Sequence, residues 1–257
     1  MEKAPVPGKN DLVRFFYVVV MFVEGYIFQA LFVYFICQSI FLLMAHSGRF
    51  FGLLQPGYRQ WVLSDLLFIF NIVFLVVLVF FDFMVAYSLH RRKNLREHPM
   101  GFLEIVIPAL GTFGNLLYNV VPFWPETMNS WLVTPEYLEL SLAIGAWLSL
   151  VGVGIGVWAI LNLRDSFGIF VQVRDIVVKG PYRSVRHPMY LGHILIDVGF
   201  FLMSPSVWMF ALSSIVIILT LYRAVLEERK FVLFCPQYSL YQRVTPFLFP
   251  WPFRVVN

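Results

Sequence analysis

Long apolar runs separated by short polar segments dominate the pattern of this chain. Four runs, at about residues 13–45, 61–89, 102–121 and 137–161, are each long enough to cross a hydrocarbon core as an α-helix. The first run is longer than a span requires and contains polar side chains, which indicates tilt, a kink or a polar inner face. The pattern therefore predicts four membrane helices in the first two thirds of the chain.

A further apolar stretch, residues 193–222, contains only one histidine and one aspartate that can be charged near neutral pH. As one helix it would be about 45 Å long, well beyond a hydrocarbon core of about 30 Å. Pro205 near its middle predicts a hairpin instead, with helices at about 189–203 and 206–222. These halves are short, so a hairpin that crosses only part of the membrane also fits. We expect an all-α, polytopic integral membrane protein with about six transmembrane helices.

Composition and charge agree with this fold class and predict its orientation. Hydrophobic residues make up 60% of the chain, charged residues 13%, and the mean hydropathy is +0.76, which disfavours a soluble domain. With a cytoplasmic N-terminus, only Arg49 and Arg59 of the 19 Lys and Arg residues fall outside cytoplasmic segments. This positive-inside bias predicts that both termini are cytoplasmic. It also explains the net charge of +4, and it predicts no nucleic-acid partner.

Two polar clusters flank the hairpin and should face each other at the cytoplasmic surface. The first, residues 180–192, reads Gly-Pro-Tyr-Arg-Ser-Val-Arg-His-Pro-Met-Tyr-Leu-Gly, and the second contains Arg223, Glu227 and Glu228. Prolines favour irregular backbone in the first cluster, and such backbone needs polar partners that lipid cannot supply. In the second cluster, a continued helix places Arg223 and Glu227 on one face at i and i+4. The clusters together predict a polar cytoplasmic pocket.

Each cluster also has a structural interpretation. The arginines and tyrosines of residues 180–192 can form an interfacial belt, which we favour for the arginines taken alone. The paired carboxylates can form a salt bridge with those arginines, or they can bind a positively charged ligand. Cys37 and Cys235 suggest no disulfide framework, and no cysteines and histidines have zinc-site spacing. We therefore expect no metal partner.

The combined motifs resemble the isoprenylcysteine carboxyl methyltransferase family, which is grouped with the phospholipid N-methyltransferases. Between about residues 150 and 250, Gly-Pro-Tyr-Arg-x-x-Arg-His-Pro-x-Tyr-x-Gly is followed by Arg-x-x-x-Glu-Glu and by a tail with Tyr238 and Tyr241. The resemblance implies an integral membrane methyltransferase that binds S-adenosylmethionine at the cytoplasmic face. It implies that residues 137–257 form the methyltransferase core, with a cofactor-binding loop, the helical hairpin and a cytoplasmic tail. Residues 1–136 would hold three spans without a recognised motif.

The resemblance also implies roles for individual residues. By position, the family's cofactor contacts fall on Asp175, Ile176, Val177, Tyr182, His187, Pro188, Met189, Tyr190 and Glu227. Arg223 is implied as the substrate-binding, catalytic residue, and Glu228 would support the cofactor contacts. His187 or His193 is a candidate base if the acceptor is a thiol or an amine, because methyl transfer needs a free lone pair. A carboxylate acceptor needs no base.

Two features depart from the family's pattern, and a third is similar to it. The family would have glycine or another small residue near position 164, where this chain has Arg164. The family also has a glycine in the tail before the first tyrosine, where this chain reads Cys235-Pro236-Gln237-Tyr238. Gly152-x-Gly154-x-Gly156 is similar to a feature of the phospholipid methyltransferases. The spacing of Gly152 and Gly156 is also that of an ordinary packing face between membrane helices, which we favour.

We therefore expect an S-adenosylmethionine-dependent methyltransferase that acts on a lipophilic small molecule or a lipidated acceptor among membrane lipids. Carboxylate, amine and thiol acceptors all stay open. One alternative is an NADPH-dependent membrane reductase of the sterol type, which the acidic pair disfavours. Another is a non-catalytic transporter whose path would be lined by Glu24, Asp65, Asp82 and Asp197; the lack of internal repeats disfavours it.

Overall fold

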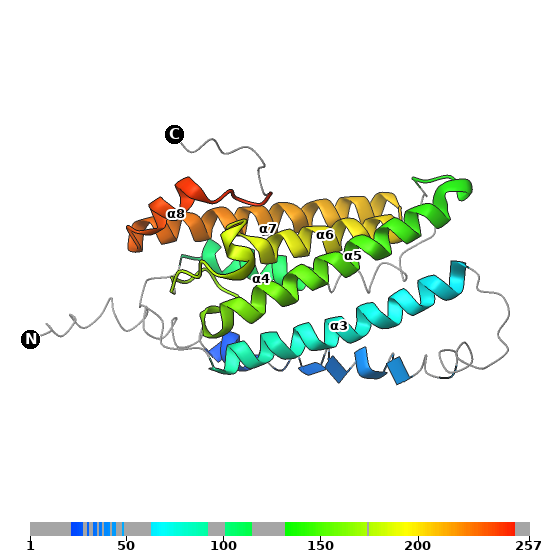
Figure 1. Cartoon of the computed structure of the whole chain (residues 1–257), viewed down its shortest axis with the longest axis horizontal. Helices are drawn as coiled ribbons and strands as arrows, with labels where there is room; N and C mark the ends of the chain where they lie inside the picture. Colours follow the sequence, from blue (N-terminus) through cyan, green and yellow to red (C-terminus); the bar gives the residue numbers. More distant parts are fainter. Residues whose placement is uncertain are drawn as a thin grey trace, which may run out of the picture.

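The computed structural model describes residues 63–91, 101–114, 132–173 and 175–249, together with scattered residues between 22 and 48. The predicted span at 13–45 lies largely outside these residues, as does the end of the span predicted at 102–121. The regular elements in the described part of the chain are helices. The longer ones lie side by side along one axis of the molecule (Figure 1).

The helices correspond closely to the apolar runs of the sequence. Their bounds are α3 (Leu63–Arg91), α4 (Leu103–Phe113), α5 (Pro135–Leu163), α6 (Pro188–Met203), α7 (Val207–Phe234) and α8 (Tyr238–Val244), with short helices η1 (Val23–Ile27), η5 (Arg164–Ser166) and η6 (Gly180–Arg183). Helices α3, α5 and α7 are long and apolar enough to cross a membrane, and α4 and α6 are shorter apolar helices. The prediction of an all-α membrane protein is confirmed. The cytoplasmic orientation stays a prediction.

The hairpin between α6 and α7 turns where Pro205 predicts. Helix α6 ends at Met203, and α7 begins at Val207 after Ser206, whose Oγ accepts a hydrogen bond of 3.2 Å from the Met209 amide. Helix α7 continues beyond the predicted end at residue 222. Its 28 residues span about 42 Å, more than the hydrocarbon core of about 30 Å. The second polar cluster therefore lies on the last turns of one continuous helix.

Helices α5 and α6 pack through facing glycines. A Cβ atom at Gly145 would lie 2.6 Å from the carbonyl oxygen of Gly199, and one at Gly152 would lie 2.6 Å from that of Gly192. The two contacts are seven residues apart on each antiparallel helix, so they form one close seam. A Cβ at Gly154 would meet no atom within 4 Å. The packing interpretation of Gly152 is confirmed.

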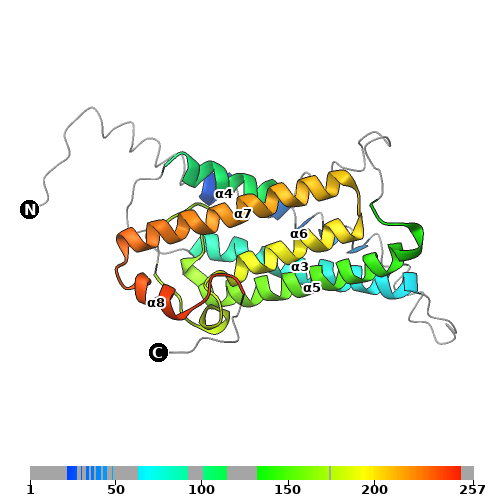
Figure 2. The ribbon, with the colours of Figure 1, turned by 90° about the horizontal axis from the view of Figure 1, so that it is seen from above.

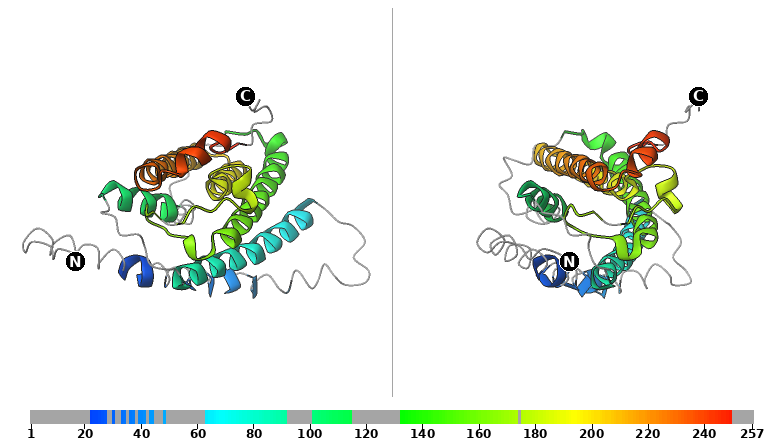
Figure 3. Two further views of the ribbon diagram at one scale, coloured as in Figure 1. Left: turned by 60° about the vertical axis from the view of Figure 1, so that its left-hand side comes forward. Right: turned by 90° about the vertical axis from the view of Figure 1, so that its left-hand side faces the viewer.

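The other helices extend this pair into a bundle. Viewed nearly along the helices in Figure 3, α6 lies between α5 and α7, while α3 lies beside α5 and α4 beside α7. The connection between α5 and α6 gathers with α8 at one end of the bundle, opposite the turn between α6 and α7 (Figures 1 and 2). This arrangement brings the two polar clusters to the same end.

Arg164 begins that connection in an unusual conformation. Its φ of 47° is positive, and among the described residues it is the one non-glycine residue with this property. Positive φ suits glycine because a Cβ atom crowds the neighbouring backbone. The geometry explains why a small residue is expected near this position.

Candidate functional site

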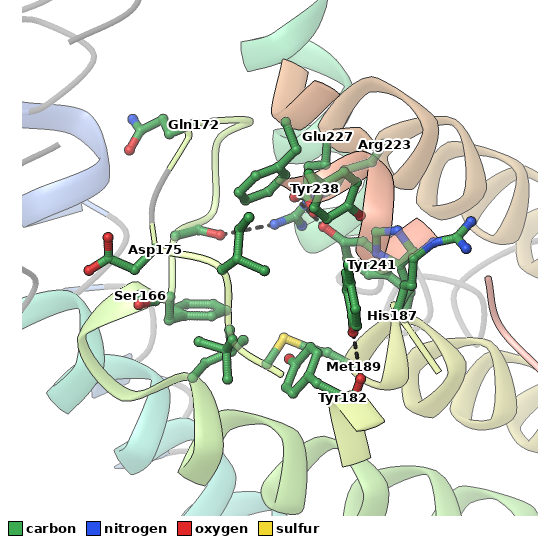
Figure 4. A pocket seen from close by; sticks show the side chains of 18 of the residues that line it. Ser166, Gln172, Asp175, Tyr182, His187, Met189, Arg223, Glu227, Tyr238 and Tyr241 are labelled. Atoms are coloured by element: carbon green, nitrogen blue, oxygen red, sulfur yellow. Dashed lines mark hydrogen bonds and ion pairs between the residues drawn. The ribbon is translucent and has the colours of Figure 1, made fainter. Parts of the chain in front are cut away.

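A pocket lies between the α5–α6 connection on one side and α6, α7 and α8 on the other (Figure 4). The space among its lining atoms is about 770 Å³, its open mouth included. The predicted site residues in its wall are Asp175, Ile176, Val177, Tyr182, His187, Met189, Tyr190, Arg223 and Glu227. Pro188 and Glu228 are not part of the wall.

Glu227 presents a carboxylate to this pocket. Its Oε1 accepts hydrogen bonds from the Tyr190 hydroxyl and, at 3.4 Å, from Arg223 Nε. No hydrogen bond from the described residues reaches its Oε2. The protein therefore orients the carboxylate through one oxygen and leaves the other for a donor from a ligand.

Arg223 is held from three directions. Besides its bond to Glu227, Nη1 donates to Thr112 Oγ1 on α4 at 3.0 Å, and Nη2 donates to the carbonyl oxygen of Gly168 at 3.1 Å. Its guanidinium also lies over the Tyr190 ring, 5.1 Å from the centroid. The side chain is buried. These contacts fix the direction of the guanidinium in the pocket.

Glu228 takes part in a separate set of contacts. Arg186 donates to both of its oxygens, from Nε at 2.5 Å and from Nη2 at 3.3 Å. His187 Nε2 lies 3.1 Å from Oε1, and Gln242 Nε2 donates to Oε2 at 2.9 Å. The salt-bridge interpretation of the paired carboxylates therefore applies to Glu228, whereas Glu227 lines the pocket.

The chain after α8 is tied to the first polar cluster through Arg186. Nη1 of Arg186 donates to the carbonyl oxygen of Thr245. The backbone amides of Arg186 and His187 donate to the carbonyl oxygens of Pro246 and Phe247 at 2.9 and 3.1 Å. Side-chain and backbone contacts thus hold the C-terminal segment against residues that line the pocket.

Tyr241 lines the pocket and adds a contact within its wall. Its hydroxyl donates to the carbonyl oxygen of Tyr182 at 2.5 Å, a bond drawn in Figure 4. Burial raises the pKa of Tyr241 to about 12, and burial together with the nearby Glu227 raises the pKa of Tyr182 well above its usual value. Both hydroxyls therefore keep their protons at pH values where an exposed tyrosine ionises.

The predicted loop contacts differ in their exposure. Ile176 and Val177 are half-buried in the wall, whereas Asp175 is exposed. In Figure 4 the Asp175 carboxylate points away from Arg223 and Glu227. The backbone and apolar side chains of this loop thus contribute more to the wall than its acid.

The two candidate bases are also separated. His187 lines the pocket and stacks on the Tyr190 ring with centroids 5.4 Å apart. His193 is not part of the wall, and its ring lies 6.2 Å from that of Phe81 on α3. His187 is therefore the histidine that can reach a ligand in this pocket. Across the described segments, no group of three or more His, Cys, Asp and Glu residues could hold a metal ion.

Sequence reasoning missed the contribution of α4. Besides Thr112, this helix supplies Glu104, whose Oε2 lies 2.5 Å from Nζ of the buried Lys230. A lone carboxylate in an apolar segment needs a partner. Glu104 within residues 102–121 could therefore have indicated a contact with a buried cation.

Comparisons with known proteins cover the segment that forms most of this site. Residues 140–233 match the family model described as phospholipid methyltransferase. The chain is also 30% identical over 158 residues to the "Cobalt-zinc-cadmium resistance protein CzcN" of Cupriavidus metallidurans, which covers 61% of this chain and 65% of that protein. The chain thus spans slightly less than two thirds of that relative's length. The pocket residues from Leu163 to Phe231 lie inside this matched segment, so this part of the chain is similar to the phospholipid methyltransferase family of membrane methyltransferases.

Proposed function

We propose that this chain is an S-adenosylmethionine-dependent methyltransferase that acts on a lipophilic or membrane-associated acceptor. The hydrogen bonds around Glu227 support this proposal most. Tyr190 and Arg223 donate to its Oε1, and none of the described residues donates to its Oε2. A carboxylate oriented in this way can accept strong hydrogen bonds from an ammonium group or a diol.

The other pocket residues also suit this cofactor, which supplies a methyl group carried on a positively charged sulfur. Tyr182 and Met189 provide aromatic and aliphatic surface, and Ile176 and Val177 also line the pocket. Adenine and the methionine chain need such surfaces, with only a few polar contacts. We propose that Glu227 binds the ammonium group or the ribose, and that the wall residues exclude water around the sulfur.

The apolar side of the pocket supports a lipophilic acceptor. Phe167, Phe170 and Met189 line the pocket and belong to a hydrophobic cluster that includes Val85 and Leu89 of α3. Through this cluster the apolar wall of the pocket packs against a helix that is long and apolar enough to cross the membrane. An acceptor with a hydrocarbon portion could bury it there, and its polar end would then meet the Arg223 side of the pocket.

The proposed reaction places few chemical demands on the protein. Methyl transfer requires a nucleophile with a free lone pair, held about 3–3.5 Å from the methyl carbon and in line with the breaking bond. Arg223 would orient the acceptor, and His187 would take a proton if the acceptor is an amine or a thiol. We also propose that residues 137–257 form the methyltransferase core.

Calorimetric titration of the detergent-solubilised chain with S-adenosylhomocysteine tests the cofactor site. We expect saturable binding to the wild type and no measurable binding to Glu227→Ala. The control variant Glu139→Ala, which removes an exposed carboxylate of α5, should bind like the wild type. Unchanged affinity in Glu227→Ala would contradict the proposed role of this residue. Saturable binding of NADPH in place of S-adenosylhomocysteine would favour the reductase alternative.

A further inference from the structure

Helix α4 lies before the segment matched by the family model, yet it contacts the pocket residue Arg223. We propose that Thr112 and Glu104 of α4 are positioning residues for methyl transfer: Thr112 sets the direction of Arg223, and Glu104 fixes the pocket wall through Lys230. The inference rests on the proposed function, because it assigns these residues a role in that reaction.

Two buried cations on α7 make matching contacts with α4. Arg223 Nη1 donates to Thr112 Oγ1 at 3.0 Å, and Lys230 Nζ donates to Glu104 Oε2 at 2.5 Å. The cations are seven residues apart, two turns of one helix face, and their partners are eight residues apart on α4. The partners follow each other in the opposite order on α4, so the two helices are antiparallel, and they lie beside each other in Figure 3.

Each cation also holds the chain between α5 and α6. Arg223 Nη2 donates to the Gly168 carbonyl oxygen at 3.1 Å, and Lys230 Nζ donates to that of Val171 at 3.0 Å. The Val171 amide in turn donates to the backbone carbonyl oxygen of Glu104 at 3.2 Å. Residues 168–171 are therefore held by α7 at both ends and by α4 at Val171.

This fixed stretch forms part of the pocket. Gly168 and Phe170 line it, so a shift of α4 would move the wall as well as Arg223. Thr112 has the more specific effect, because its hydroxyl accepts from one defined nitrogen of the guanidinium. Without that acceptor, the Arg223 guanidinium loses one of the contacts that set its direction relative to Glu227, to which it is bonded through Nε.

A change at Thr112 should therefore affect methyl transfer more than cofactor binding. The Tyr190 hydroxyl still orients Glu227 in a Thr112 variant, since that bond does not involve α4. A misplaced Arg223 would instead lower the rate of the transfer step, and misplacement of a reacting group by about 1 Å lowers rates by about 100-fold. A purely structural role for Thr112 would lower binding, rate and thermal stability together.

The test compares Thr112→Val, which keeps the shape of the side chain, with Thr112→Ser, which keeps the hydroxyl. We would measure S-adenosylhomocysteine affinity by calorimetry, and the initial rate of label transfer from methyl-labelled S-adenosylmethionine into the organic-soluble fraction of a membrane extract. Thr112→Val should bind S-adenosylhomocysteine like the wild type but transfer label about 10- to 100-fold more slowly. Thr112→Ser should restore the rate, and Thr134→Val, at an exposed threonine, should leave it unchanged.

A wild-type rate in Thr112→Val, or an equal loss in the valine and serine variants, would overturn the inference while leaving the proposed function intact. Failure of the wild type to bind S-adenosylhomocysteine would instead overturn the proposed function. If the valine variant does not fold, Thr112→Cys replaces the hydroxyl with a weak acceptor of similar size, and the same slow transfer is expected.

For Glu104→Gln, which weakens the Lys230 contact that holds the wall, we expect weaker S-adenosylhomocysteine binding. Unchanged binding would overturn the role assigned to Glu104.

Discussion

Arg186 and Glu228 lie 42 residues apart in the sequence, yet Nε of the first is 2.5 Å from Oε1 of the second. The pair joins the loop before α6 to the last turns of α7. It also separates the roles of two adjacent acids, because Glu228 is occupied by protein donors whereas Glu227 presents one oxygen to the pocket. The structural interpretation of the paired acids thus applies to Glu228, and the proposed ligand contact is left to Glu227.

Loss of the Glu228 carboxylate should loosen the C-terminal segment. In Glu228→Ala, Arg186 and Gln242 each lose an acceptor, and a hydrogen bond to a charged group contributes about 1.5–3 kcal/mol. We expect a lower thermal midpoint in detergent and faster hydrogen exchange in residues 238–248. Exchange that is unchanged in this segment, with Glu139→Ala as the control, would show that the pair does not hold it.

The glycine seam between α5 and α6 should tolerate no added methyl group. In Gly152→Ala the new Cβ would lie 2.6 Å from the Gly192 carbonyl oxygen, so the helices must separate. Gly154→Ala, on the same helix, places its Cβ in open space and removes only the low helix propensity of glycine. Size-exclusion profiles and thermal midpoints should show strong destabilisation for the first variant and an equal or higher midpoint for the second. Similar midpoints for both would contradict the seam.

Arg164→Gly should stabilise the protein. Its φ of 47° is unfavourable for arginine but accessible to glycine, so the substitution relieves strain of about 1 kcal/mol. We expect a higher thermal midpoint, whereas Arg183→Gly, at an exposed position without positive φ, should give an equal or lower one. A lower midpoint in Arg164→Gly would show that contacts of the arginine side chain outweigh the strain.

Alkaline pH should weaken the Tyr241 contact in a defined window. Burial raises the pKa of Tyr241 from 10.0 to about 12 in the folded chain, so its contribution is complete below pH 10 and is lost as pH rises toward 12. Tyr241→Phe removes this one titration. The thermal midpoint of the variant should therefore fall less steeply between pH 10 and pH 11 than that of the wild type, and equal slopes would contradict the assignment.

The hairpin and the meeting of the two polar clusters could be predicted from local features. Residues 193–222 are too long for one span, and Pro205 lies where the chain must turn, so length and a single proline determine the topology. The packing role of Gly152 followed from its spacing to Gly156, because small residues four apart share a helix face.

The separate roles of Glu227 and Glu228 could not be predicted in the same way. Adjacent residues on a helix point about 100° apart, and which of them faces the pocket depends on how α7 is rotated against its neighbours. The contacts of Thr112 and Glu104 depend on how α4 lies against α7, and more than 100 residues separate the partners in sequence. Such tertiary pairings leave no periodic signal in the chain.

We propose that the chain transfers a methyl group from S-adenosylmethionine, bound in the Glu227 pocket, to a membrane acceptor. The most direct measurement incubates the purified chain with methyl-labelled S-adenosylmethionine and a membrane extract, and follows label in the organic-soluble fraction. We predict label that depends on the wild-type chain, that is lost in Glu227→Ala and that is retained in Glu139→Ala. Absence of label with the wild type, or equal labelling by the wild type and Glu227→Ala, would contradict the claim.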